Sequence, residues 1–189
     1  MTVSLIYNLA DTFFVAQTQN TNIVAGVSLC APLFTTLMAL GNIFGQGGSY
    51  ILACDIWARF SMLSTKFRTA GDSHMQLITA SLMTPEDVVL FVSYSGATRD
   101  MMDTLRLAKD NGAKVILLTH YDDAPGTALA DVVLLCGAKE SPLDSGNIPV
   151  KVALLYVAEV LVLRYTMDDP ENANAAQDRT SEALAVKML

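Results

Sequence analysis

A buried strand that runs directly into an amphipathic helix is the feature that most constrains how this chain folds. Residues 87–92 read DVVLFV, the uninterrupted pattern of a strand covered on both faces, as in a parallel sheet. After a turn at residues 93–98, apolar residues recur at helical spacing, and these are Ala97, Met101, Leu105 and Ala108. The strand, turn and helix together predict an α/β fold with the turn at the carboxyl end of a central strand.

The turn itself has the composition of a phosphate site. It carries hydroxyls and a glycine at Ser93, Ser95, Gly96 and Thr98. A helix N-terminus offers unpaired N–H groups and partial positive charge, and the hydroxyls add further donors. Because no Lys or Arg lies in the turn, the pattern favours a small phosphate ester over a nucleoside triphosphate held by a P-loop lysine. An ordinary capped turn is the alternative, since these residue types are common.

A second candidate anion loop reads GQGGS at residues 45–49 and precedes a helix. Gly47 and Gly48 would let a ligand approach the backbone closely, and Ser49 supplies a hydroxyl. A glycine pair also closes membrane helices and simple turns, so this loop alone decides little. Two such loops on neighbouring strands would converge on one phosphate ester.

The remaining pattern alternates strands and helices. Residues 67–74 predict a short strand that leads into a helix, which is capped by Asp72 or Ser73 and runs over Met75, Leu77, Ile78 and Leu82. Two more buried strands are predicted at residues 114–119 and 131–135. The alternation indicates one parallel sheet with helices on both faces. A helix at residues 148–167 is apolar nearly all round, and we expect it to form a homodimer contact.

The charge distribution divides the chain into unlike parts. No Asp, Glu, Lys or Arg occurs from Thr12 through Cys54, which indicates two unlike pieces joined together. The family resemblances of the two pieces, given below, imply a boundary between residues 1–41 and 42–189. The net charge of −7 argues against a nucleic-acid surface. The three cysteines lack metal-type spacing, so we expect reduced thiols, a cytoplasmic location, and no metal or other cofactor.

The first part of the chain resembles a membrane transporter. The strings IYNLADTFFV, SLCAPLF and MALGNIFGQGGS, within residues 1–49, are similar to the N-terminal fragment of MATE-type efflux transporters. The uncharged run at residues 23–40 approaches the length of a membrane helix. No second charge-free run of that length follows, so we do not expect transport. The resemblance implies an apolar, helical segment at residues 1–41 that would allow contact with a membrane.

From about residue 42 the chain resembles a SIS (sugar isomerase) domain, specifically the effector domain of RpiR/MurR-type transcriptional regulators. The strings that carry the resemblance are IFGQGGSYILACDIWARF, FRTAGDSHMQL, DVVLFVSYSGATRD and ADVVLLCGAKESPLDSG. It implies a three-layer α/β/α sandwich with a five-stranded parallel sheet, assembly into a homodimer or higher homo-oligomer, and recognition of a phosphosugar. The two resemblances overlap at residues 41–49, which predicts a fusion of two unlike pieces.

The resemblance also implies which residues bind the ligand. Ser49, Ser93, Ser95 and Thr98 would hold the phosphate, and Glu140 matches a position that faces the sugar. Regulators of this type begin with a helix-turn-helix domain, and this sequence lacks that pattern. We therefore expect no direct nucleic-acid binding by this chain.

Three classes of function remain open from the sequence. The favoured one is a module that senses a phosphosugar. An aldose–ketose phosphate isomerase would need a base beside the C1–C2 unit of the sugar, for which Glu140 or His74 could be proposed. The third class is a membrane-anchored fragment of a transporter fusion.

Overall fold

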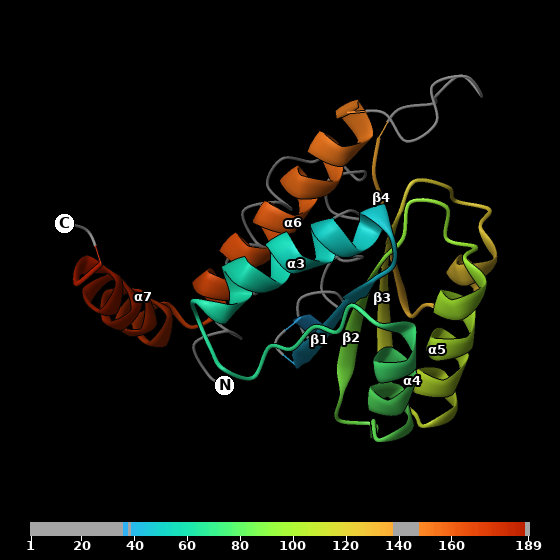
Figure 1. Cartoon of the computed structure of the whole chain (residues 1–189), viewed down its shortest axis with the longest axis horizontal. Helices are drawn as coiled ribbons and strands as arrows, with labels where there is room; N and C mark the ends of the chain where they lie inside the picture. Colours follow the sequence, from blue (N-terminus) through green and yellow to red (C-terminus); the bar gives the residue numbers. More distant parts are fainter. Residues whose placement is uncertain (1–35, 38, 138–147, 188–189) are drawn as a thin grey trace, which may run out of the picture.

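In the computed structural model, which describes residues 36–37, 39–137 and 148–187, a parallel sheet lies between two layers of helices (Figure 1). The strands are β1 (Leu40–Gly45), β2 (Val88–Val92), β3 (Lys114–Thr119) and β4 (Val132–Leu135), in that order across the sheet. Each strand pairs in parallel with the next. The strands predicted at residues 87–92, 114–119 and 131–135 are thereby confirmed to within a residue at each end.

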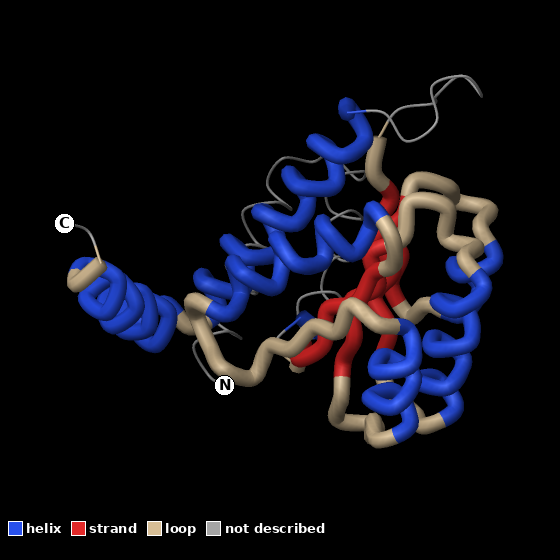
Figure 2. The backbone as a smooth tube through the Cα atoms, viewed as in Figure 1, coloured by secondary structure: helices blue, strands red, loops and turns tan. Residues whose placement is uncertain are grey.

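The alternation of side chains along β2 explains the two helical layers. Val88, Leu90 and Val92 face one core cluster, which also contains residues of α3 (Gly48–Ser61) and α6 (Ile148–Asp168). Val89 and Phe91 face the other cluster, which contains residues of α4 (Ser73–Ser81) and α5 (Arg99–Asp110). Figure 2 shows these helix pairs on opposite sides of the strands. Every residue of β2 is buried, as an unbroken apolar run requires.

The short strand predicted within residues 67–74 is reduced to a single bridge. Arg68 N donates to Gly41 O at 2.8 Å, and Ile43 N donates to Arg68 O at 2.9 Å, in parallel register. The Thr69 hydroxyl then donates to Ile43 O at 2.7 Å, in place of the next backbone N–H, so the ladder stops. The described residues hold four strands, and the expected five-stranded sheet is not confirmed. The chain passes the edge of β1 here, which lets α3 and α4 cover opposite faces of the sheet.

The helices on the second face differ in part from their predicted form. Asp72 caps α4 by accepting a hydrogen bond from Met75 N at 3.0 Å, as predicted. The apolar side chains predicted along this helix are largely exposed, and its buried residues are Gln76 and Ala80. Ala97, expected on the apolar stripe of the next helix, precedes α5 and is exposed.

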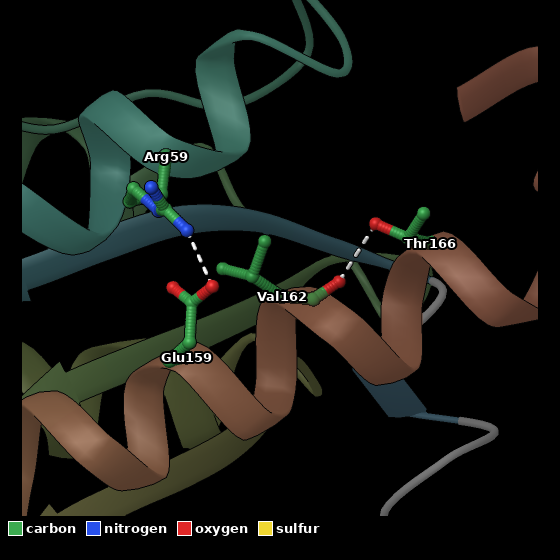
Figure 3. A network of polar contacts seen from close by, with 4 residues as sticks. All are labelled: Arg59, Glu159, Val162 and Thr166. Carbon is green, nitrogen blue, oxygen red and sulfur yellow. Dashed lines mark hydrogen bonds and ion pairs between the residues drawn. The ribbon is translucent and has the colours of Figure 1, made fainter. Parts of the chain in front are cut away.

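The C-terminal helices complete the first layer and extend beyond it. The Arg59 guanidinium of α3 pairs with the Glu159 carboxylate of α6, and the Thr166 hydroxyl donates to Val162 O at 3.0 Å (Figure 3). After α6, helix α7 (Pro170–Ala185) extends away from the sheet (Figure 1). No helix among the described residues is both long and apolar enough to cross a membrane. The transporter-like segment predicted at residues 1–41 lies almost entirely outside those residues.

Candidate functional site

The two predicted anion loops leave the same edge of the sheet. Gly45 at the end of β1 lies in register with Val92 at the end of β2, so the loops that follow are neighbours. Tyr94 N donates to Ser49 Oγ at 3.3 Å and thereby joins them. This edge is formed by the carboxyl ends of the strands, where open α/β sheets bind their ligands.

Each serine hydroxyl of these loops accepts a hydrogen bond from a backbone N–H. Besides the Tyr94 contact at Ser49, Ser93 Oγ accepts from Gly96 N at 3.1 Å and Ser95 Oγ accepts from Ala97 N at 3.3 Å. A hydroxyl that accepts from the backbone keeps its proton for another acceptor. Thr98 is the N-cap of α5 and makes no side-chain capping bond. These hydroxyls therefore supply donors where the helix N-terminus already favours an anion.

Gly96 fixes the shape of the second loop. Its φ is +59°, and a Cβ at this position would lie 2.6 Å from Ala124 Cβ and 3.0 Å from Thr119 Oγ1. Gly96 O accepts from Gly126 N at 2.9 Å, which holds the turn against the short 3₁₀ helix η1 (Pro125–Leu129). Only glycine satisfies both the left-handed backbone and the close contact.

A cavity of about 540 Å³ lies where the N-terminal ends of α3, α4 and α5 meet. It is lined by residues from all three ends: Gln46, Gly47, Gly71, Asp72, Ser73, Thr98 and Asp100. Its volume is in the range of small-molecule sites. A smaller cavity of about 170 Å³ shares Ser73 and Asp100 with it and is also lined by His74. The N-terminal ends of three helices therefore converge on this cavity.

The predicted ligand-binding residues occupy this region to different degrees. Gly47 and Thr98 line the larger cavity. The others that the structure describes lie in the adjoining loops and are not among its lining residues: Gly48, Ser49, Ser93, Ser95 and Gly96. Glu140 lies outside the described residues.

Sequence reasoning missed the contribution of the loop before α4. Gly71 packs closely on Tyr50, because a Cβ on this glycine would lie 2.7 Å from the Tyr50 ring. Asp72 and Ser73 were interpreted only as helix caps, although a glycine followed by small polar residues before a helix is the same signal as in the other two loops. Gln46 and Asp100, which also line the cavity, carried no sequence signal that set them apart.

The charge around the cavity is negative. Among the residues that the structure describes, its lining carries the carboxylates of Asp72 and Asp100 and no Lys or Arg. The part of the chain that the structure describes contains no group of three side chains suited to bind a metal ion. Ligand recognition by this lining therefore depends on neutral hydrogen-bond donors rather than on ion pairs.

An aromatic cluster flanks the serine-rich turn on the side of α6. The rings of Tyr94 and His120 stack with their centroids 5.2 Å apart, and Tyr121 meets both edge-on. His120 Nδ1 lies 2.7 Å from Cys136 O. Since a carbonyl oxygen only accepts, this contact places the proton of a neutral imidazole on Nδ1.

Comparison with known proteins agrees with this architecture. The model of the SIS domain family matches residues 42–164. The HTH-type transcriptional regulator RpiR from Escherichia coli is 32% identical over 139 residues, which are 74% of this chain and 47% of that protein. The chain thus spans about half the length of the curated relatives it matches.

Two solved structures show the same fold. The Vibrio vulnificus NanR protein complexed with ManNAc-6P has a TM-score of 0.75 at 24% identity, covering 84% of this chain and 60% of that one. The sugar isomerase domain of the RpiR transcription factor from Sphaerobacter thermophilus has a TM-score of 0.71 at 20% identity, covering 94% and 93%. At these identities the likeness concerns the fold alone.

Proposed function

The chain belongs to the SIS domain family, and from this premise we propose that residues 42–189 form a phosphosugar-binding module, the ligand-sensing part of an RpiR-type regulator. The homologous regulator and the NanR protein, which was solved with ManNAc-6P, support this proposal. The net charge of −7 does not suit a nucleic-acid surface, so we assign no nucleic-acid contact to this chain.

The observation that carries the proposal is the set of serine hydroxyls at the sheet edge. The oxygens of Ser49, Ser93 and Ser95 each accept one backbone N–H, so their protons are left to donate to a ligand. A phosphoryl group accepts several hydrogen bonds and is favoured at a helix N-terminus. We therefore assign the phosphate to these hydroxyls and Thr98, and the sugar to the adjoining cavity.

The test is thermal unfolding of the full chain with a panel of sugar phosphates. A ligand at about 100 times its dissociation constant should stabilise the folded state by roughly 2.7 kcal/mol. Ser95→Asp should abolish the shift, because its carboxylate repels the phosphate. Ser181→Asp, on the exposed surface of α7, is the matched control and should keep the shift. The proposal is wrong if no sugar phosphate shifts the wild-type protein, or if Ser95→Asp responds as the wild type does.

Sugar-phosphate isomerisation is the second candidate function. His74 lines the smaller cavity that shares Ser73 and Asp100 with the larger one, so an imidazole lies next to the assigned sugar site. A coupled assay on the same sugar phosphates separates the two functions. Turnover that is lost in His74→Asn favours an isomerase, whereas saturable binding without turnover favours a sensor.

We also propose a homodimer that forms through α6. Its outward side is apolar, with exposed side chains at Ile148, Val152, Leu155, Tyr156, Val160, Leu163 and Met167. A two-fold pairing of this surface with itself would remove it from water. Light scattering should give the mass of a dimer for the wild type and of a monomer for Leu163→Glu. The cytoplasmic location and the membrane contact of residues 1–41 stay predictions.

A further inference from the structure

Helix α4 turns its polar side inward and an apolar stripe outward. Its buried residues are Gln76 and Ala80, whereas Met75 is 51% exposed, Ile78 is 42% exposed, and the C-cap residue Leu82 is 76% exposed. Met75, Ile78 and Leu82 recur at i, i+3 and i+7, so they share one side of the helix, opposite Gln76 and Ala80. We refer to these three side chains as the α4 stripe.

The domain does not use the α4 stripe to hold this helix in place. Gln76 Nε2 donates to Gly45 O at 2.8 Å and to Ala70 O at 2.7 Å, so hydrogen bonds from a buried amide fix the helix on the domain. Surface helices ordinarily place their apolar side chains inward, because burial removes these side chains from water. In α4 that apolar surface still faces outward and is available to a partner.

The charge pattern of α4 differs from that of the neighbouring helix. Residues 73–85 contain no Asp, Glu, Lys or Arg. Helix α5 lies in the same layer (Figure 2), and its exposed residues are all charged: Arg99, Asp100, Asp103, Arg106 and Asp110. A solvated helix surface carries charge, as α5 does, whereas the centre of a protein–protein interface is depleted of charged residues. The α4 stripe therefore has the composition of an interface.

The spacing of the stripe fits a second copy of the same helix. From Met75 to Leu82 the stripe spans about 10 Å of the helix axis, with Ile78 near its middle. If two copies cross antiparallel about a two-fold axis at Ile78, each Ile78 meets its equivalent, and each Met75 meets the Leu82 of the second copy. Each chain carries a net charge of −7, but two uncharged stripes meet without repulsion between like charges.

A lipid surface suits the stripe less well than a second copy. Helices that lie on membranes carry Lys or Arg beside their apolar side, which attract anionic lipids. The charged residues that flank residues 73–85 in the sequence are instead acidic, namely Asp72 and Glu86.

The size of the stripe indicates a weak contact. From their exposed fractions, the three side chains together expose roughly 300 Å², the size at which an apolar patch on a monomer is often functional. Pairing two such patches with the polar residues around them would bury on the order of 1,000 Å², at the low end for specific interfaces. Association through α4 should therefore depend on protein concentration.

We propose that the α4 stripe is a second self-association surface, through which two copies of this chain pair about a two-fold axis. It lies on the face of the sheet opposite α6 (Figures 1 and 2), so contacts through α4 and through α6 can form at the same time. Dimers formed through α6 would thus associate into tetramers at high concentration. This inference does not depend on phosphosugar binding.

The experiment is sedimentation equilibrium of the full chain between about 1 µM and about 300 µM, which brackets micromolar dissociation constants. The average mass of the wild type should rise with concentration. Ile78→Glu should weaken this association by more than about tenfold, because it places two carboxylates opposite each other. Leu184→Glu also replaces an exposed apolar residue but lies on α7, so it is the matched control and should keep the rise. Leu82→Lys, at the most exposed position of the stripe, should act as Ile78→Glu does and serves if that variant does not fold.

The Leu163→Glu variant separates the α4 contact from the α6 contact. It should be a monomer at about 1 µM and dimerise as the concentration rises, and adding Ile78→Glu should keep it monomeric throughout. If the α6 dimer does not form, the wild type should rise from monomer to dimer with the same response to Ile78→Glu.

Several results would overturn the inference. It is wrong if the mass of the wild type does not rise with concentration, if Leu163→Glu alone abolishes the rise, or if Ile78→Glu leaves the rise unchanged. It is also wrong if Ile78→Glu lowers the free energy of unfolding without changing the mass, since another part of the same chain would then cover the stripe. Binding of the wild type to phosphatidylglycerol vesicles, lost in Ile78→Glu and without any rise in mass, would assign the stripe to a lipid surface instead.

Discussion

Replacing Gly96 by alanine tests whether the serine-rich turn is as constrained as its geometry indicates. A non-glycine residue at a φ of +59° costs about 1–2 kcal/mol. The new Cβ would also lie 2.6 Å from Ala124 Cβ, which is bonded directly to backbone and cannot rotate away. Such overpacking costs about 1–3 kcal/mol. Gly96→Ala should therefore lower the free energy of unfolding by about 2–5 kcal/mol.

Two other glycines of the site help to separate the cost of the backbone conformation from the cost of the close contact. Gly47 combines a φ of +55° with a ψ of −128°, the glycine-dominated conformation of the first central residue of a type II′ turn. Apart from its chain neighbours, no atom of the described residues lies within 4 Å of a Cβ built there, so Gly47→Ala should lose only the conformational part, about 1–3 kcal/mol. Gly48 begins α3 without a positive φ and in equally open space. Gly48→Ala should leave stability unchanged or raise it by up to about 1 kcal/mol.

The assay is urea unfolding of the three variants and the wild type, compared at equal m-values. The expected order of stability is Gly48→Ala highest, then Gly47→Ala, then Gly96→Ala. A Gly96→Ala variant that loses less than about 2 kcal/mol of unfolding free energy would refute the close contact with Ala124, and with it the fixed shape of the turn.

Two further predictions concern titratable groups. Burial opposes ionisation of Asp131, but hydrogen bonds from Lys109 Nζ at 2.6 Å and Val115 N at 2.7 Å outweigh it and hold the pKa below its ordinary value. The ionised Asp131 carboxylate stabilises the folded state above the pKa of the unfolded state, about 3.9. This stabilisation is lost as the pH falls through the lower pKa of the folded state. Asp131→Asn should thus lower the free energy of unfolding by about 1 kcal/mol at pH 7 and by little at pH 2.5, as measured by urea unfolding. An equal loss at both pH values would contradict the pairing of Asp131 with Lys109. Burial raises the pKa of Cys136 to about 11. A thiol reagent at pH 8 should therefore label Cys54 well before Cys136 in the native protein, as followed by mass spectrometry. Labelling of both cysteines at the same rate would contradict the burial of Cys136.

The parts of the fold that the sequence predicted well are those whose burial is complete. Residues 88–92 are buried on both faces, and their apolar run therefore identifies them without knowledge of their neighbours. The buried face of helix α4 was harder to predict, because Gln76 faces inward while Met75 and Ile78 are exposed. Its orientation depends on the carbonyls of Gly45 and Ala70, which accept hydrogen bonds from the Gln76 amide. A hydrophobic pattern carries no information on such polar pairing.

The third loop of the site escaped prediction for a topological reason. A helix that follows a parallel strand begins at the carboxyl edge of the sheet, so α3 and α5 had to begin there. Helix α4 follows no strand, only the bridge at Arg68, but that bridge is parallel to β1 and therefore directs the chain to the same edge. One residue of sheet pairing thus brings Asp72 and Ser73 to the cavity. It is the bridge, rather than a full fifth strand, that makes this a site of three helix N-termini.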